Sequence, residues 1–148
     1  MKTANENKCI QVCNSLLRGE LSAVETYGQT IKKFEGDPAA ATLRDILAEH
    51  EQTVALLREN VLHMGGEPST DSGAWGTFAS ATQGVAKVFG ESSALQNLRR
   101  GEEHGLQEYT EALANDDVMP ECKEMISREL LPRTQNHILT LEGLTAAH

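Results

Sequence analysis

The chain has 148 residues, a length that predicts a single domain over residues 1–148. It has 22 acidic and 13 basic side chains, which give it a formal charge of -9. The acidic charge argues against nucleic acid or an anionic membrane surface as a partner, because their phosphates attract clustered Lys and Arg. No stretch approaches the roughly 20 apolar residues of a membrane span, and the polar start MKTANENK lacks the apolar region of a secretory signal, so a cytoplasmic protein is expected.

The first predicted helix runs from about Asn5 to Phe34, and a glutamate interrupts its apolar face. Side chains suited to a core recur alternately three and four residues apart, the interval of helices packed in a bundle. The series consists of Ile10, Cys13, Leu17, Glu20, Val24, Tyr27, Ile31 and Phe34. The helix should stop at Gly36, after which Asp37 and Pro38 should begin the second helix.

The second predicted helix ends near Met64, and here a histidine interrupts the apolar face. Its series consists of Leu43, Leu47, His50, Val54, Leu57, Val61 and Met64. Roughly 25 residues then separate it from the third helix, which is too many for a bundle turn. Residues 75–89 carry their own helical pattern, which predicts a fifth, shorter helix within a crossover. The second and third helices would then run parallel, and the first and third antiparallel.

The third and fourth predicted helices each contain one more interruption. The third series, which ends near Ala114, consists of Leu95, Leu98, Glu102, Leu106, Tyr109 and Leu113. The fourth, which opens at Pro120, consists of Ile126, Leu130, His137, Leu141 and Leu144. Pro132 lies inside this last helix and should kink it, because proline lacks a backbone donor and clashes with the preceding turn. The four series together predict an all-α four-helix bundle.

An internal repeat relates the two halves of the chain. The sequence Arg-Gly-Glu ends at Glu20 and again at Glu102, and a tyrosine follows seven residues later as Tyr27 and Tyr109. Two occurrences do not suit a solenoid. They indicate a duplicated helical hairpin folded into one bundle.

Four polar side chains, Glu20, His50, Glu102 and His137, therefore occupy core positions near the middle of four helices. Carboxylates and imidazoles that converge inside a bundle are typical of a metal site. We expect one coordination sphere or one hydrogen-bonded network, with Tyr27 and Tyr109 supporting it through carboxylates.

Six segments are distinctive, namely LLRGELSAVETY, AEHE, DSGAWGTFA, KVFG, RRGEEHGLQEY and LLPRTQNHI. Through them nearly the whole chain resembles an uncharacterised bacterial family of small ferritin-like four-helix proteins. The resemblance implies a ferritin-like bundle with a long helical crossover but no established activity. The first of these segments is also similar, more distantly, to ferritins and bacterioferritins, which implies an iron-ligand role for Glu20 and a neighbouring role for Tyr27.

The sequence departs from a two-metal centre at two positions. Such centres take Glu-x-x-His from two helices, but Leu47 lies three residues before His50, and Thr134 three before His137. Two carboxylates and two imidazoles suit at most one ion, iron or manganese with zinc as a competitor. On ideal helical spacing the neighbouring acids Glu49, Glu51 and Glu103 should point away from the core, although a rotated helix could supply one of them as a further ligand.

Two classes of function stay open at this point. The first is a ferritin-like metalloprotein, whose open coordination positions would allow oxygen or peroxide chemistry. The second is a non-catalytic stress or interaction protein with no metal, whose core Glu, His and Tyr side chains form a structural hydrogen-bond network. The sequence does not decide whether the protein is an enzyme.

Other side chains carry weaker expectations. Cys9, Cys13 and Cys122 should meet at one end of the bundle, as reduced core residues or as a thiol switch. His63 and His104 are expected at the surface. Apolar side chains of the crossover should cover the bundle or form the interface of a homodimer or higher homo-oligomer.

Overall fold

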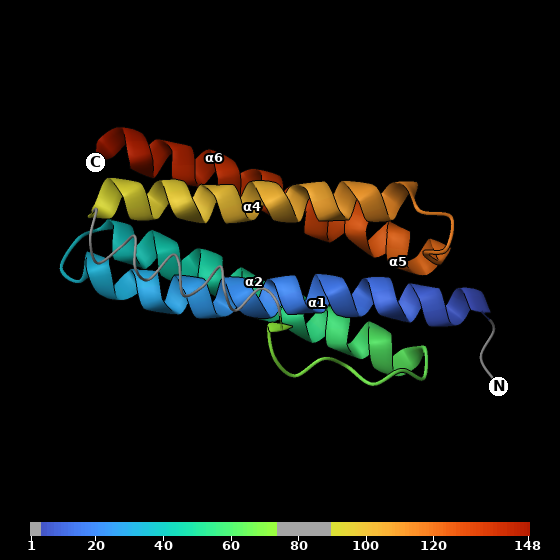
Figure 1. The fold of residues 1–148 in the computed structure, drawn as a ribbon. Coiled ribbons are helices and arrows are strands. Elements are labelled where there is room, and N and C mark those ends of the chain that lie inside the picture. Colours follow the sequence, from blue (N-terminus) through green and yellow to red (C-terminus); the bar gives the residue numbers. More distant parts are fainter. Residues whose placement is uncertain (1–3, 74–89) are drawn as a thin grey trace.

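The computed structural model describes residues 4–73 and 90–148, and shows four long helical segments (Figure 1). These are α1 (Ala4–Ile31), extended by the 3-10 turn η1 (Lys32–Phe34), then α2 (Ala39–His63), α4 (Glu91–Ala114), and a last segment composed of α5 (Pro120–Met125), the π turn η3 (Ile126–Leu130) and α6 (Leu131–Ala147). Within these ranges there is no strand, which confirms the all-α prediction. None of the helices described is long and apolar enough to cross a membrane.

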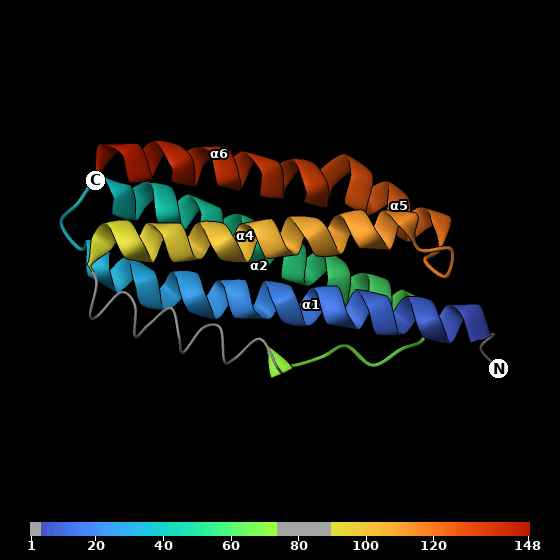
Figure 2. The same cartoon turned by 45° about the horizontal axis from the view of Figure 1, so that its top comes forward.

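The helices form two hairpins that pack against each other. One hairpin is α1 with α2, and the other is α4 with α5 to α6 (Figures 1 and 2). In both views α2 and α4 run in the same direction, whereas α1 and α4 run in opposite directions. The fifth helix predicted over residues 75–89 lies outside the described residues, and the ferritin-like assignment stays a prediction.

The first part of the connection after α2 lies along α1. The side chain of Asn14 donates a hydrogen bond to the carbonyl of Glu67 (3.0 Å) and accepts one from the backbone N–H of Ser69 (2.9 Å). One turn later, Arg18 donates to the hydroxyl of Ser69 (3.0 Å). These contacts attach the connection to α1 between Asn14 and Arg18.

A glycine and an aspartate form the turn between α1 and α2, as the sequence predicts. Gly36 has φ +84°, a left-handed conformation that other residues adopt only at a cost. The carboxylate of Asp37 accepts a hydrogen bond from the backbone N–H of Ala39 (2.8 Å), which satisfies a donor in the first turn of α2. The hairpin therefore closes immediately after Phe34.

Two glycine-to-alanine substitutions should change stability in opposite directions. A Cβ atom would meet no described atom within 4 Å at either Gly36 or Gly143, so sterics do not distinguish them. Gly36→Ala should lower the free energy of unfolding by about 1–2 kcal/mol because of its positive φ. Gly143→Ala, inside α6, should raise it by about 0.5–1 kcal/mol. Urea denaturation would measure both, and an equal change in both variants would contradict this account.

Pro132 disturbs the last helix, as the sequence predicts, and the disturbance takes the form of a π turn. The backbone N–H of Leu131 bonds to the carbonyl of Ile126, five residues earlier, and α6 continues from there with Pro132 in its first turn. The extra residue in this turn relieves the α-type bonding that proline cannot complete. After the turn, Thr134, His137 and Leu141 are buried on one face.

Two hydrophobic clusters fill the bundle, and the four polar core residues lie between them along each helix. The first cluster includes Leu17, Leu57 and Ile126. The second includes Phe34 and Leu95. A polar layer thus separates two apolar layers near the middle of the bundle.

Candidate functional site: a buried Glu, His and Tyr network

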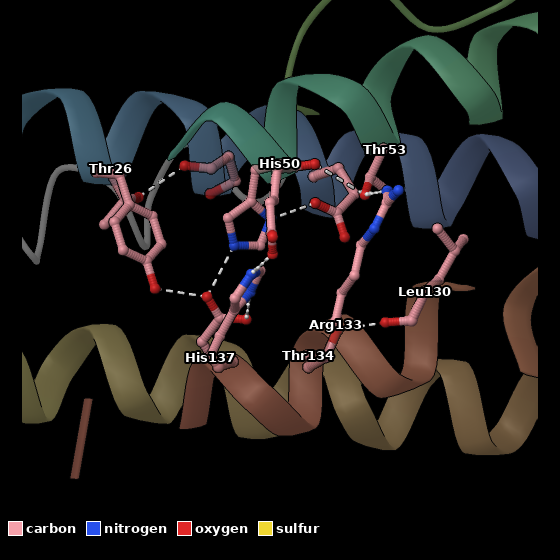
Figure 3. Close-up of polar contacts among 12 residues, drawn as sticks. Thr26, His50, Thr53, Leu130, Arg133, Thr134 and His137 are labelled. Carbon is pink, nitrogen blue, oxygen red and sulfur yellow. Dashed lines mark hydrogen bonds and ion pairs between the residues drawn. The ribbon is translucent and has the colours of Figure 1, made fainter. Parts of the chain in front are cut away.

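The four predicted side chains meet in the bundle core, one from each of α1, α2, α4 and α6. Glu20, His50, Glu102 and His137 retain only 3–7% of their accessible surface. In Figure 3, His50 on α2 and His137 on α6 face each other, and their ring centroids are 4.8 Å apart. Both histidines are therefore buried in the core.

His50 lies between the two glutamates. Its Nδ1 bonds to Oε2 of Glu20, and its Nε2 lies 2.7 Å from Oε2 of Glu102. A neutral imidazole has only one N–H, so donation to both carboxylates requires the imidazolium. Burial by itself lowers the pKa of His50, but the charges of Glu102 and Glu20 outweigh it and raise that pKa well above its ordinary value.

Glu102 has the largest number of partners in the network. Its Oε2 accepts hydrogen bonds from His50 and from the hydroxyl of Tyr27 (2.5 Å), and its Oε1 lies 3.3 Å from Nδ1 of His137. Burial opposes ionisation of this carboxyl, but the neighbouring His50 and His137 outweigh burial and hold the pKa of Glu102 below its usual range. Glu102 is therefore a carboxylate in the folded protein.

The two tyrosines of the repeat pair with glutamates across the bundle. Tyr27 on α1 donates to Glu102 on α4, and Tyr109 on α4 donates to Glu20 on α1. Burial, followed by the charge of the partner carboxylate, raises the pKa of each tyrosine well above its ordinary value. Both hydroxyls therefore stay protonated and act as donors.

The crossed pairs place the two glutamates on opposite sides of the His50 ring. One ligand atom from each of His50, Glu102 and His137 lies within 4.8 Å of the others. Glu20 contacts the other ring nitrogen of His50. The structure thus gathers all four residues into one network, and the four-ligand metal set stays a prediction.

Glu49 is a further partner of the network, which ideal helical spacing does not predict. Its Oε1 lies 2.7 Å from Nε2 of His137, although it was expected to point away from the core. The side chain stays 42% exposed, so it reaches the histidine from the edge of the bundle. Helical spacing describes the direction of the Cα–Cβ bond, whereas a glutamate is long enough to bend back toward a neighbouring helix.

Leu47 and Thr134, which replace the bridging glutamates of a two-metal centre, both have structural contacts. Leu47 packs against the second hydrophobic cluster. Thr134 is buried and donates its hydroxyl to the carbonyl of Leu130 (2.9 Å), as Figure 3 shows. Neither position offers a carboxylate, in agreement with the sequence.

A cavity adjoins the network between α1 and α4. Its wall includes Glu20, Tyr27, Glu102 and Tyr109 as well as small residues, among them Gly105. The glycines of the repeated Arg-Gly-Glu sequence also line it. In each copy of the repeat, the glutamate therefore supplies a carboxylate to the site, and the preceding glycine, which has no side chain, leaves room for the cavity.

Comparison with known proteins identifies a family. The sequence profile of a domain of unknown function (DUF2383) matches residues 8–115, which is most of the chain. The chain belongs to this family. Neither the curated proteins nor the solved structures include a match to this DUF2383 protein.

Proposed function

We propose that this DUF2383 protein is a metalloprotein of ferritin-like type that binds one divalent transition-metal ion in the polar layer of its core. The observation that carries the proposal is the buried grouping of His50, Glu102 and His137, whose ligand atoms lie within 4.8 Å of one another. Metal–ligand bonds of about 2.0–2.2 Å separate neighbouring ligand atoms by roughly 3–4 Å. Small movements of these three side chains would therefore be sufficient to bring their ligand atoms to the separations of a metal site.

The donor set favours iron or manganese. Two imidazoles and one carboxylate are the ligands of non-haem Fe(II) sites. Glu20 contacts the other ring nitrogen of His50, so it would orient that ligand from the side away from the ion. Zinc accepts the same donors and would compete. With Glu20 and Glu102 ionised and both histidines neutral, a divalent ion makes the layer electrically neutral.

The site suits one ion better than two. Leu47 and Thr134 occupy the places from which bridging carboxylates would come, and the additional acid Glu49 lies at the edge of the layer. Iron or manganese with an open coordination position would supply reactivity toward oxygen or peroxide. The cavity beside Glu20 and Glu102 is a place where such a small molecule could bind.

A structural network is the second candidate, and a specific observation favours it. Both carboxylate oxygens of Glu20 and Glu102, and both ring nitrogens of His50 and His137, already have hydrogen-bond partners. A fully satisfied network can fix the packing of a bundle without a metal. In that case the protein is a non-catalytic stress or interaction protein.

Metal content and Fe(II) binding distinguish these candidates. Protein purified without a metal-affinity tag should contain up to one iron or manganese per chain by mass spectrometry. Anaerobic titration should show one equivalent of Fe(II) bound per chain, with only slow oxidation when oxygen is added.

Two histidine variants on α2 provide the comparison. His50→Ala should abolish Fe(II) binding, whereas His63→Ala, at the exposed end of the same helix, should leave it unchanged. Absence of binding in the unmodified protein would favour the structural network. Two equivalents with rapid oxidation would instead contradict a single-ion site.

A further inference from the structure

The end of the bundle where α1 begins is also the end where α5 lies (Figure 1). Three cysteine side chains from these two helices meet. Cys9 and Cys13 are one turn apart on α1, and Cys122 comes from the first turn of α5. All three are at most 1% exposed. Their sulfur atoms lie within 4.8 Å of one another, and those of Cys13 and Cys122 are 3.1 Å apart.

Two N–H groups are directed at these sulfurs. The side-chain amide of Asn60 donates to Sγ of Cys13 (3.3 Å), and the backbone N–H of Met119 donates to Sγ of Cys9 (3.4 Å). The three cysteines belong to the first hydrophobic cluster. Packing alone does not require an amide among thiols, whereas N–H donors stabilise the thiolates that ligate metals.

We propose that Cys9, Cys13 and Cys122 form a second metal site, which binds one Cu(I) ion through three sulfurs. Thiolates select soft ions such as Cu(I) over the harder ions proposed for the polar layer. No His, Asp or Glu joins the three cysteines among the residues with described positions, so tetrahedral zinc would lack a fourth protein ligand. The ion replaces thiol protons, which pass to solvent, and no electron transfer is involved.

The geometry requires only a small adjustment. Metal–sulfur bonds of about 2.3 Å in a trigonal arrangement place the sulfurs about 4 Å apart. That separation lies between the 3.1 Å of Cys13 and Cys122 and the 4.8 Å limit of the group. Cys9 and Cys122 both lie near the start of a helix, where fraying would admit an ion.

Competition with a Cu(I) chelator tests the proposal. Reduced protein, kept anaerobic, should remove one equivalent of Cu(I) per chain from its bicinchoninate complex. X-ray absorption of the unmutated protein should then show a shell of three sulfurs at about 2.3 Å. Failure to compete, or a shell containing nitrogen or oxygen, would overturn the proposal without any variant.

Single substitutions test the contribution of each sulfur. Cys9→Ser and Cys122→Ser should each weaken Cu(I) binding at least about 100-fold, with helical content checked by circular dichroism. His63→Ala should bind as the unmodified protein does. Unchanged affinity in Cys9→Ser would reduce the site to a thiol pair and contradict the three-sulfur arrangement. Preferential binding of Zn(II) would contradict the assigned metal.

Discussion

Replacing Glu102 by Ala should lower the free energy of unfolding of the metal-free protein by about 3 kcal/mol or more. The carboxylate is buried and accepts hydrogen bonds from His50, His137 and Tyr27. Its removal leaves these donors without an acceptor inside the core, where an unpaired polar or charged group is costly. Urea denaturation in the presence of a chelator would measure the change.

The adjacent Glu103 provides the matched control. Its side chain is 51% exposed and pairs with Arg99 at 2.9 Å on the surface of α4. Glu103→Ala should cost less than about 1 kcal/mol, because exposed ion pairs contribute little. Comparable losses in both variants would show that Glu102 is not the centre of a buried network.

The comparison is best made near pH 5.5, where both charged partners contribute. The pKa of Glu102 is lowered in the fold, so its contribution is present above about pH 4.3 and lost as the pH falls through the folded value. The pKa of His50 is raised, so its contribution is present below about pH 6.5 and lost as the pH rises through the folded value. We expect the stability from this pair to be greatest between those two limits.

Metal binding to the polar layer should release protons and become tighter as the pH rises. His50 meets a carboxylate at both ring nitrogens, so an ion that binds at one nitrogen must displace a proton. For each proton released, the apparent affinity should increase about tenfold per pH unit. Fe(II) or Mn(II) titrations at several pH values, with an indicator dye in weak buffer, would measure the affinity and the released protons.

His50→Asn keeps a polar side chain on α2 but removes this titrating ring. Any ion that it still binds should show a weaker dependence on pH. An affinity that stays constant between about pH 5.5 and 7.5 in the unmodified protein would exclude displacement of the His50 proton. It would place the ion elsewhere in the protein.

The sequence predicts the helices and the members of the polar layer for a specific physical reason. A glutamate or histidine in a series of apolar residues must be buried with a partner, because burial without one is too costly. This argument located Glu20, His50, Glu102 and His137, and the repeat added Tyr27 and Tyr109. All six side chains lie in one network.

The sequence does not predict how these side chains pair. The crossed Tyr27–Glu102 and Tyr109–Glu20 bonds depend on the axial offset between α1 and α4, which helical spacing does not contain. The contact of Glu49 with His137 depends on how the long Glu49 side chain bends at the edge of the bundle core. Pro132 predicts an irregularity in the last helix, but it does not predict that the irregularity is a π turn.

The polar layer also lies on the boundary between the two hairpins, so neither hairpin holds the network alone. The α1–α2 hairpin supplies Glu20, Tyr27 and His50, and the other supplies Glu102, Tyr109 and His137. Both crossed tyrosine bonds span that boundary. Docking of the hairpins and completion of the layer are therefore one event. An ion held by both halves would act as a clamp, and its removal should accelerate amide exchange along the facing sides of α1 and α4.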